Sequence, residues 1–454
     1  MTKLEFSSIY SGSKWIDNVR VTLDKDGIIT AIDQLTDAAM KKAKFQGYAV
    51  PGVLNAHSHA FQIAMAGSAE NIARQSGADD FWSWREQMYK LALQLDPDEM
   101  RTVCTYAYCK MLEAGYTEVS EFHYLFHDEN GNPYENAFAM TDTVVEAAEI
   151  AGIRLNLIPV LYSTGSINTP PNERQRRFIF KSADMYLKFV SDAKKRYKNI
   201  RMSAGVHSIR GATKDQILDV AAFCEEQAWE FHMHIAEQML EVNMCREHYG
   251  TTPVDWITKN FEVSPLWHLV HSTHVTDAEL TQISKSKATI VLCPTTEANL
   301  GDGLFPARSY INGKNRWLIG SDSHITVSPW RELNTLDYGQ RLKFMKRNVL
   351  CPPGHDSGTT LFNELSAHQE LTPILKTKSL TVGQRFDASV FPESDPFLST
   401  EQARHRLSCI VYGPSMNGPE AVYSRGQLVV ESGRHVQAKT YAQELAKVRR
   451  RCLA

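Results

Sequence analysis

The feature that most constrains the fold of this chain is a series of eight short apolar runs that alternate with longer stretches of helical periodicity. The runs cover residues 50–59, 116–124, 153–162, 202–207, 230–235, 266–271, 288–293 and 317–321. Residues 182–197, 214–227 and 330–346, which lie between or after the runs, have amphipathic helical patterns. Buried strands followed by helices are typical of βα units with a parallel sheet. Eight such units predict the α/β class and a (β/α)8 barrel with insertions.

Both ends of the chain have a different pattern, in which apolar and polar residues alternate as in half-buried strands. Residues 19–23 and 28–32 flank a turn-like segment, and the alternation returns at residues 386–391 and 420–430. This pattern predicts a hairpin at the N-terminal end and further strands at the C-terminal end. We therefore expect a small composite β-sandwich domain from residues 1–49 and 382–454, joined to a barrel domain over residues 50–381.

Composition excludes several classes of partner. A formal net charge of -3 is no basis for binding nucleic acid or an anionic membrane surface. No apolar segment approaches the roughly 20 residues that a membrane span needs, and the polar start lacks a secretory apolar region. The eight cysteines have no CxxC spacing, so we expect reduced and mostly buried thiols. These features predict a cytoplasmic protein.

Polar side chains gather where the predicted strands end, which is the edge at which barrel enzymes build their active sites. His57 and His59 alternate on one strand and so point the same way. Later strand ends carry further candidates, namely His232, His234 and Glu237, then His271 and His274, then Asp322 and His324. Three neutral imidazoles and one carboxylate suit a divalent ion such as Zn²⁺ and leave a position open for water.

The same strand ends also supply candidate catalysts. Glu237 lies three residues beyond His234 and is placed to carry a proton from a water to a departing nitrogen. His271 is placed to orient that water or to stabilise the developing charge. The fourth run continues as Val206-His207-Ser208-Ile209-Arg210 and holds no lysine of the kind that bridges two ions in related hydrolases. A site for one metal ion is therefore favoured.

Taken together, these motifs resemble the amidohydrolase superfamily, whose deaminases use one metal ion on a (β/α)8 barrel. The resemblance rests first on residues 57–59, 234–237, 271 and 321–324. Residues 57–62, 80–86, 121–124, 170–173, 293–303 and 338–342 further resemble the formiminoglutamate deiminases within that superfamily. The resemblance implies hydrolysis of a formimino group with release of ammonia, and a homodimeric assembly.

The resemblance also implies a role for individual residues. The implied ligands of one divalent ion, Zn²⁺ with Fe²⁺ as the alternative, are His57, His59, His234 and Asp322. The implied catalytic residues are Glu237, His271 and Asp322, and the implied substrate contacts are Gln62, Arg85, Tyr124, His207 and Arg210. A small-molecule substrate with two carboxylates makes chemical sense of two arginines, because guanidinium binds carboxylate through two parallel hydrogen bonds.

Two other functions remain open at this point. The same metal site would serve a deaminase that acts on a ring substrate such as guanine. A barrel that has lost catalysis and serves as a binding protein is the third hypothesis, although such proteins typically lose metal ligands. A purely structural role for the two arginines also remains open, since Arg85 can pack on tryptophan at the surface and Arg210 can form an ordinary salt bridge.

Overall fold

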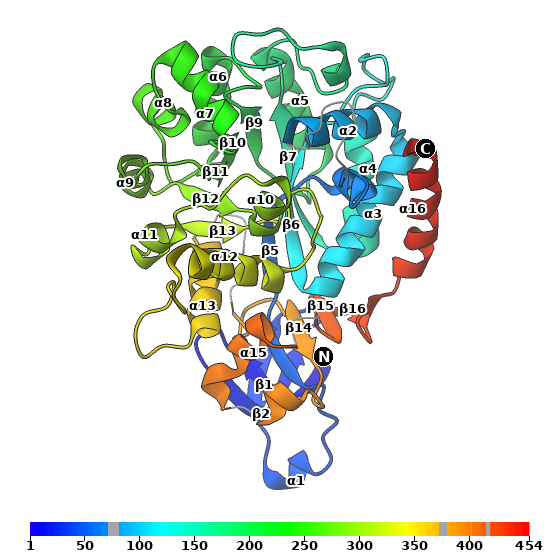
Figure 1. Ribbon diagram of the computed structural model, residues 1–454. Helices are drawn as coiled ribbons and strands as arrows, with labels where there is room; N and C mark the ends of the chain where they lie inside the picture. The colour runs from blue at the N-terminus through cyan, green and yellow to red at the C-terminus, as the bar shows by residue number, and fades with distance from the viewer. Residues whose placement is uncertain (71–80, 372–378, 401, 415–417, 454) are drawn as a thin grey trace.

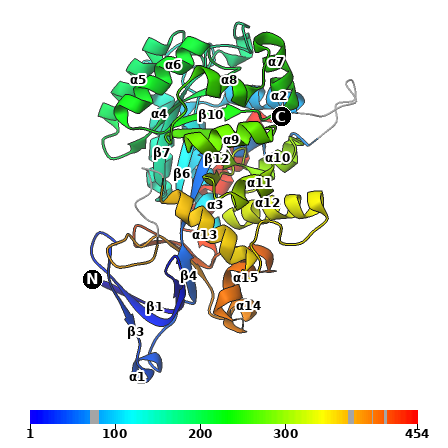
Figure 2. The ribbon, with the colours of Figure 1, turned by 90° about the vertical axis from the view of Figure 1, so that its left-hand side faces the viewer.

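The computed structural model describes residues 1–70, 81–371, 379–400, 402–414 and 418–453. Figure 1 shows a barrel of strands and helices above a smaller sheet that is built from both ends of the chain. Figure 2, turned by 90°, shows helices around the outside of the barrel and the smaller sheet below it. The active-site candidates all lie in the barrel.

The barrel consists of eight parallel strands that lie in sequence order around the ring. They are β5 (Val53–Ser58), β6 (Tyr116–His123), β7 (Arg154–Leu161), β9 (Ala204–Ser208), β10 (Phe231–Ile235), β11 (Trp267–His271), β12 (Thr289–Leu292) and β13 (Trp317–Ile319). The short β8 (Arg201–Met202) pairs with β7 off this path. A parallel bridge between Ser58 and Asp322 brings the first strand to the last. The predicted (β/α)8 barrel is confirmed.

Each strand run is almost entirely buried, since its side chains point either into the barrel or against the helices. The principal helices are α2 (Phe81–Gln94), α3 (Pro97–Ala114), α4 (Ala139–Ala151), α5 (Ala183–Arg196), α6 (Lys214–Gln227), α7 (Met239–Tyr249), α8 (Pro253–Asn260), α9 (Asp277–Ser286), α10 (Pro294–Leu300), α11 (Ala307–Asn312), α12 (Pro329–Phe344) and α13 (Ser357–Gln369). Local signals set their ends. Helix α3 begins at the capping box of Asp96 and Glu99 and ends at Gly115, whose φ of 105° favours glycine.

The smaller sheet joins the two chain ends through β4 (Tyr48–Pro51), which pairs with β1 on one side and β14 on the other. Its eight strands are β1 (Thr2–Tyr10), β2 (Trp15–Leu23), β3 (Ile29–Gln34), β4, β14 (Ala388–Phe391), β15 (Ala421–Ser424), β16 (Gln427–Glu431) and β17 (Arg434–His435). Phe6, Val21 and Phe386 belong to its own apolar cluster, separate from the barrel core. The alternation of apolar and polar residues at both chain ends therefore corresponds to the strands of one shared sheet.

The last helix, α16 (Ala438–Cys452), leaves this sheet and returns to the barrel, where it lies beside α3 (Figure 1). Arg449 donates a hydrogen bond of 2.7 Å to the Ala64 carbonyl, and Arg451 pairs with Glu99 at the start of α3. The C-terminal segment thus contributes strands to the smaller sheet and a helix to the outside of the barrel.

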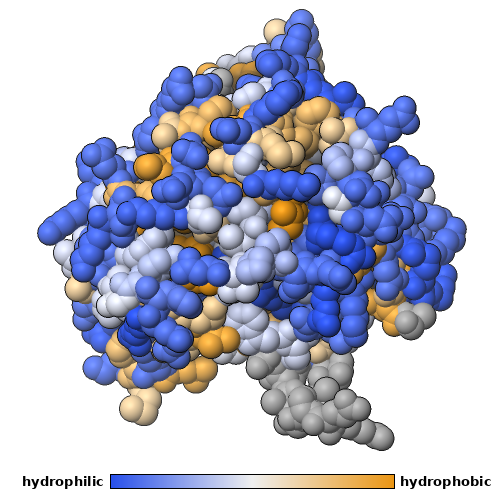
Figure 3. Space-filling model, turned by 90° about the horizontal axis from the view of Figure 1, so that it is seen from above, coloured by the Kyte–Doolittle hydropathy of each residue, from blue (hydrophilic) through white to orange (hydrophobic). Residues whose placement is uncertain are grey.

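A helix that spans a membrane must be both long and apolar. Among the described residues, no helix is both long enough and apolar enough to cross a bilayer. Viewed from above, the protein is largely hydrophilic, with apolar patches between charged side chains (Figure 3). Six of the eight cysteines are buried, as predicted, and no disulfide joins any of the eight.

Candidate metal centre

Four donor atoms converge at the end of the barrel where the strands finish. His57 lies on β5, His59 directly follows it, His234 lies on β10, and Asp322 follows β13. The Nε2 atom of His234 lies 3.1 Å from that of His57 and 3.3 Å from that of His59. Asp322 Oδ1 lies 3.4 Å and 3.3 Å from the same two nitrogens. Donors about 2.0–2.2 Å from one tetrahedral ion lie about 3.3–3.6 Å apart, so this spacing is close to what such an ion needs.

Hydrogen bonds on the outer side of two rings show that the donor set suits a cation. His59 Nδ1 lies 3.0 Å from the Phe122 carbonyl oxygen, and His234 Nδ1 lies 2.9 Å from that of His207. Because each Nδ1–H donates to a carbonyl, the two Nε2 atoms carry lone pairs that face each other. Lone pairs at 3.3 Å repel unless a positive charge lies between them. The residues present therefore fit a divalent metal ion.

Burial keeps these ligands in the form that binds metal. Burial, together with His57, lowers the pKa of His59 to about 3, and burial also lowers the pKa values of His57 and His234. All three imidazoles are therefore neutral at physiological pH. Burial would raise the pKa of Asp322, but the hydrogen bond with His57 and the positive charge of His271 outweigh burial and hold this pKa well below its usual range. The site thus offers three neutral nitrogens and one carboxylate.

Three residues at or beside the donor set have an unusual backbone conformation that orients their side chains. His271, Asp322 and His324 have φ values of 67°, 47° and 60°, in the left-handed region that non-glycine residues rarely adopt. The backbone of Asp322 also closes the barrel, since its N–H donates to the His57 carbonyl and its carbonyl accepts from the His59 N–H, at 3.0 and 3.1 Å. Residues with strained backbone conformations of this kind cluster at active sites and ligand-binding sites. Here the closure holds the carboxylate against both histidines.

Next to the donors lies a group with acid–base character. His271 Nε2 lies 3.7 Å from Glu237 Oε1 and 3.9 Å from Asp322 Oδ2, and its Nδ1 lies 3.3 Å from Glu297 Oε1. Burial alone would lower the pKa of His271, but these carboxylates raise it to about 10. Burial also raises the pKa of Glu237. The arrangement therefore pairs a cationic imidazole with a carboxyl group that can hold a proton.

Arg210 faces this group from the segment after β9. Its guanidinium lies 3.2 Å from Glu237 Oε2 and 3.2 Å from Glu241 Oε2, and it stacks over the rings of Phe81 and Trp82. One guanidinium nitrogen, Nη1, is buried without a hydrogen-bond partner in the described part of the chain. An unpaired donor on a buried cation is costly unless a ligand takes it. Arg210 is therefore built to receive a further acceptor.

The other predicted substrate contacts lie around the same space. Arg85 on α2 donates to the Tyr162 hydroxyl at 2.7 Å, and the His207 ring packs on Tyr162 with centroids 4.4 Å apart. Tyr124 accepts a hydrogen bond of 2.8 Å from Gln62, and its ring packs on that of His59. Oε1 of Gln62 has no hydrogen-bond partner among the described residues. The structure thus brings the five predicted substrate contacts together around one space. Asp80, the first residue of the motif at 80–86, lies outside the described residues.

Three further histidines from the strand ends, His232, His274 and His324, lie outside the donor set. His232 lies two residues before His234 on the same face of β10, so it occupies a deeper level of the barrel interior. His274 lies beyond β11, where its N–H donates to the Ala236 carbonyl. His324 supports the site from behind, since its Nε2 lies 3.1 Å from the Ser58 hydroxyl, which donates to Glu121.

Sequence reasoning missed three residues that shape the site. Tyr162 ends its strand run as the histidines end theirs, so the same strand-end rule would have found it. Gln175 donates to the Tyr162 hydroxyl at 2.6 Å, but it comes from an irregular insertion with no periodic signal. Glu241 binds Arg210 from the first turn of α7, where an acidic residue ordinarily only favours the helix N-terminus.

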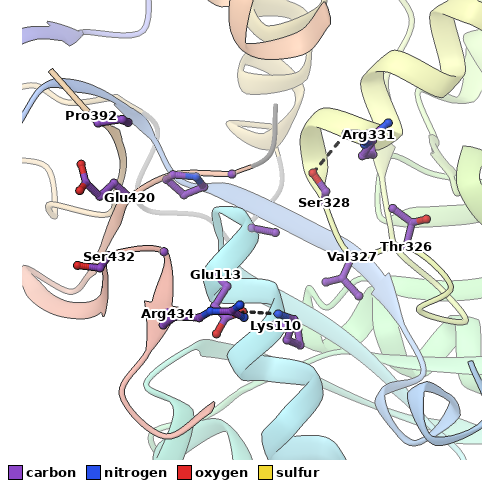
Figure 4. A pocket seen from close by; sticks show the side chains of 14 residues that line it. Lys110, Glu113, Thr326, Val327, Ser328, Arg331, Pro392, Glu420, Ser432 and Arg434 are labelled. Carbon is purple, nitrogen blue, oxygen red and sulfur yellow. Dashed lines mark hydrogen bonds and ion pairs between the residues drawn. The ribbon is translucent and has the colours of Figure 1, made fainter. Parts of the chain in front are cut away.

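A cavity of 690 Å³ between the barrel and the terminal sheet is separate from these donors. Figure 4 shows its wall, to which Lys110 and Glu113 contribute from α3 and Arg434 from β17. Glu113 pairs with Lys110 and lies 3.9 Å from Arg434, so these charges satisfy one another. The cavity contains none of the four metal donors.

The fold and the four convergent donors define a metal-dependent hydrolase of the (β/α)8 class. Residues 48–429 match the model of the amidohydrolase family, and the chain belongs to this family. Formimidoylglutamate deiminase of Pseudomonas aeruginosa is 38% identical over 440 residues, which cover 96% of each protein. A crystal structure of an amidohydrolase from Brucella melitensis is 32% identical and covers 100% of both chains with a TM-score of 0.91.

A more distant structure shares the fold alone. An adenosine deaminase from Xanthomonas campestris with bound zinc is 17% identical, with a TM-score of 0.80 over 99% of this chain and 98% of that one. The family assignment agrees with the intact donor set and makes the chain an enzyme. The hypothesis of a binding protein that has lost its metal ligands is therefore not supported.

Proposed function

We propose that the enzyme hydrolyses N-formimino-L-glutamate to N-formyl-L-glutamate and ammonia, a step of histidine degradation. The observation that carries the proposal is the pair of arginines, Arg85 and Arg210, beside a single-ion donor set. The relative from Pseudomonas aeruginosa that shares 38% identity over nearly the full length supports the same substrate. A substrate with two carboxylates calls for two fixed cations, whereas a neutral purine ring does not.

Substrate binding follows from the groups around the donors. Arg210 offers one carboxylate its Nη1, which has no hydrogen-bond partner among the described residues, and Arg85 approaches from α2 on the side of Tyr162. Gln62 and Tyr124 lie next to His59, where they would contact the formimino group or its neighbouring nitrogen. Trp82 and Phe81 pack against Arg210 and shield it from water. This shielding strengthens each charge-assisted hydrogen bond to the substrate.

His57, His59, His234 and Asp322 would hold a divalent ion, which when bound would supply Lewis acidity to a water at neutral pH. Asp322 Oδ2, which faces His271, accepts a proton from that water as its oxygen bonds to the formimino carbon. The cationic His271 would stabilise the negative charge that develops on the attacking water oxygen. Glu237 would give its proton to the terminal nitrogen, which becomes an amine. The proton held by Asp322 would then pass to this amine while the Glu237 carboxylate takes the proton of the new hydroxyl, so that the bond between the former formimino carbon and the terminal nitrogen breaks, ammonia leaves and the formyl carbonyl forms.

Zinc as the resident ion, a homodimeric assembly and a cytoplasmic location belong to the same proposal. The donor chemistry supports zinc, because two or more imidazoles with one carboxylate are common ligands of this ion. The division into a catalytic barrel over residues 50–381 and a composite domain of residues 1–49 and 382–454 is also part of it. Metal analysis, sedimentation, cell fractionation and expression of the parts test these points.

The test of the main proposal is an ammonia-release assay on the purified full chain with bound zinc counted in the same preparation. We expect turnover of N-formimino-L-glutamate, loss of turnover on chelation, and no turnover of guanine. The matched control is a His57→Asn/Asp322→Asn double variant, which lacks two donors. A preparation with its metal in place that releases no ammonia from N-formimino-L-glutamate would refute the assignment.

A further inference from the structure

A second cluster of potential ligands lies inside the barrel beneath the metal donors. It consists of Glu230, directly before β10, His232 on β10 and His268 on β11. His232 and His268 are register partners on adjacent strands, and their ring centroids lie 4.4 Å apart. The three residues are only 2%, 0% and 2% exposed. None of them belongs to the catalytic arrangement described above.

Most polar atoms of this cluster have no hydrogen-bond partner among the described residues. Neither carboxylate oxygen of Glu230 and neither ring nitrogen of His232 has a hydrogen-bond partner in the described part of the chain, and the same holds for His268 Nδ1. Arg201 is near enough to influence Glu230 by its charge, but it does not satisfy either oxygen. Burying a carboxylate without hydrogen bonds is costly. The cluster therefore requires an additional binding partner.

The spacing of the donors indicates what that partner is. Glu230 Oε2 lies 3.4 Å from His232 Nε2, and Glu230 Oε1 lies 3.7 Å from His268 Nε2. These separations are long for direct hydrogen bonds. They are close to the roughly 3.3–3.6 Å between donors that share a tetrahedral ion. The catalytic donors lie at the similar separations of 3.1–3.4 Å. One potential ligand atom from each residue lies within 4.8 Å of the other two.

We propose that Glu230, His232 and His268 bind a second divalent transition-metal ion, of the zinc type, with a structural role. Two imidazoles and one carboxylate are borderline ligands that suit such an ion. His234 follows His232 by two residues, about 6.6 Å along the strand, so the two ions would occupy separate levels of the barrel. The second ion would neutralise Glu230 and hold β10 to β11 directly below His234 and His271.

The proposal is tested by counting zinc in the full chain after saturation with Zn²⁺ and gel filtration, using native mass spectrometry. We expect two equivalents in the unmodified protein and one in His268→Asn. The His57→Asn/Asp322→Asn double variant is expected to retain one equivalent, now in the lower site. His123→Asn changes another buried histidine, which contacts Thr141 and neither cluster, and should keep two equivalents.

Two results would overturn the second site. One is a single equivalent in the saturated, unmodified protein, a measurement that needs no variant and so does not depend on any variant folding. The other is a His268→Asn protein that still holds two equivalents, which would place the extra ion at the surface. His268→Asn should keep ammonia release within about threefold. Failure of the proposed reaction would leave the zinc count unaffected, so the two proposals fail separately.

Discussion

The guanidinium of Arg210 lies 3.2 Å from the carboxylate of Glu237. A residue proposed to hold a substrate carboxylate is thus in contact with the residue proposed to protonate the leaving nitrogen. Glu241 holds the same guanidinium from α7 and also accepts a hydrogen bond of 3.0 Å from the Ala236 N–H. Binding of the substrate and placement of the proton donor therefore depend on one network.

Replacing Arg210 by methionine is expected to lower kcat/KM for N-formimino-L-glutamate by about 10- to 100-fold, because charge-assisted hydrogen bonds to the substrate are lost. Steady-state kinetics and metal analysis measure this together. Bound metal should be unchanged, since Arg210 touches none of the four donors. Arg210→Lys keeps the charge but not the fork and should recover only part of the loss. Loss of the metal in Arg210→Met would show that the residue is structural.

Arg85→Met should mainly raise KM, because Arg85 lies outside hydrogen-bond contact with the acid–base group and contacts Tyr162 instead. A rise of about tenfold or more is expected from the loss of one charged hydrogen bond. Lys90→Met is the matched control, since Lys90 lies on the same helix and is exposed. Equal effects of the two substitutions would argue that Arg85 acts through α2 rather than on the substrate.

Glu237→Gln removes a carboxyl group that can donate and accept a proton while keeping its size. We expect kcat to fall by about 10²- to 10⁴-fold, the usual contribution of general acid–base catalysis. KM should change little, and the metal content should stay the same because Glu237 is not among the four donors. A near-normal kcat in this variant would assign the proton transfer to another group.

Removing the metal should reduce stability as well as activity. A ligand that binds only the folded state at 100 times its Kd stabilises that state by about 2.7 kcal/mol. Dialysis against a chelator is therefore expected to lower Tm and abolish ammonia release, and added Zn²⁺ should restore both. Differential scanning calorimetry with the activity assay measures the two effects on one sample. Restored Tm without restored activity would point to binding at the lower site alone.

Asp142 on α4 provides a stability test at acid pH. It accepts two hydrogen bonds of 2.7 Å from Arg196 and one of 2.6 Å from the Tyr197 hydroxyl. Burial would raise its pKa, but these hydrogen bonds outweigh burial and lower it. Because the folded pKa is below the unfolded value of about 3.9, the contribution is present above that pH and is lost as the pH falls through the folded pKa.

Asp142→Asn is therefore expected to destabilise the protein at pH 7 by about 1 kcal/mol, a modest effect because the pair is partly exposed. The difference in Tm between the variant and the unmodified protein should shrink as the pH drops below about 4. Thermal unfolding at a series of pH values measures this. A difference that is constant across the series would show that the carboxylate charge is not the source of the effect.

Most of the barrel was accessible from the sequence because burial on both faces leaves an unbroken apolar run for each strand. The helices expected at residues 182–197, 214–227 and 330–346 correspond to α5, α6 and α12, with ends that differ by at most two residues. The position of α16 was not accessible. Its amphipathic pattern shows that one face is covered, but nothing local indicates that α3 covers it.

The candidate site was predicted from residue type and strand position, and the structure brings His57, His59, His234 and Asp322 together. Alternation places His232 and His234 on the same face, but it does not say which level of the barrel each one occupies. That depends on the stagger between strands once the ring has closed. Gln175 was out of reach for another reason, since it approaches Tyr162 from an irregular insertion.

The bridge between Ser58 on β5 and Asp322, which follows β13, affects when the metal site can form during synthesis of the chain. His57 and His59 emerge early in synthesis, but Asp322 is made only after the other seven strands of the ring. A nascent chain that stops before residue 322 has an open seam and only three of the four ligands. Coordination of the catalytic ion by all four ligands would therefore report that the ring has closed.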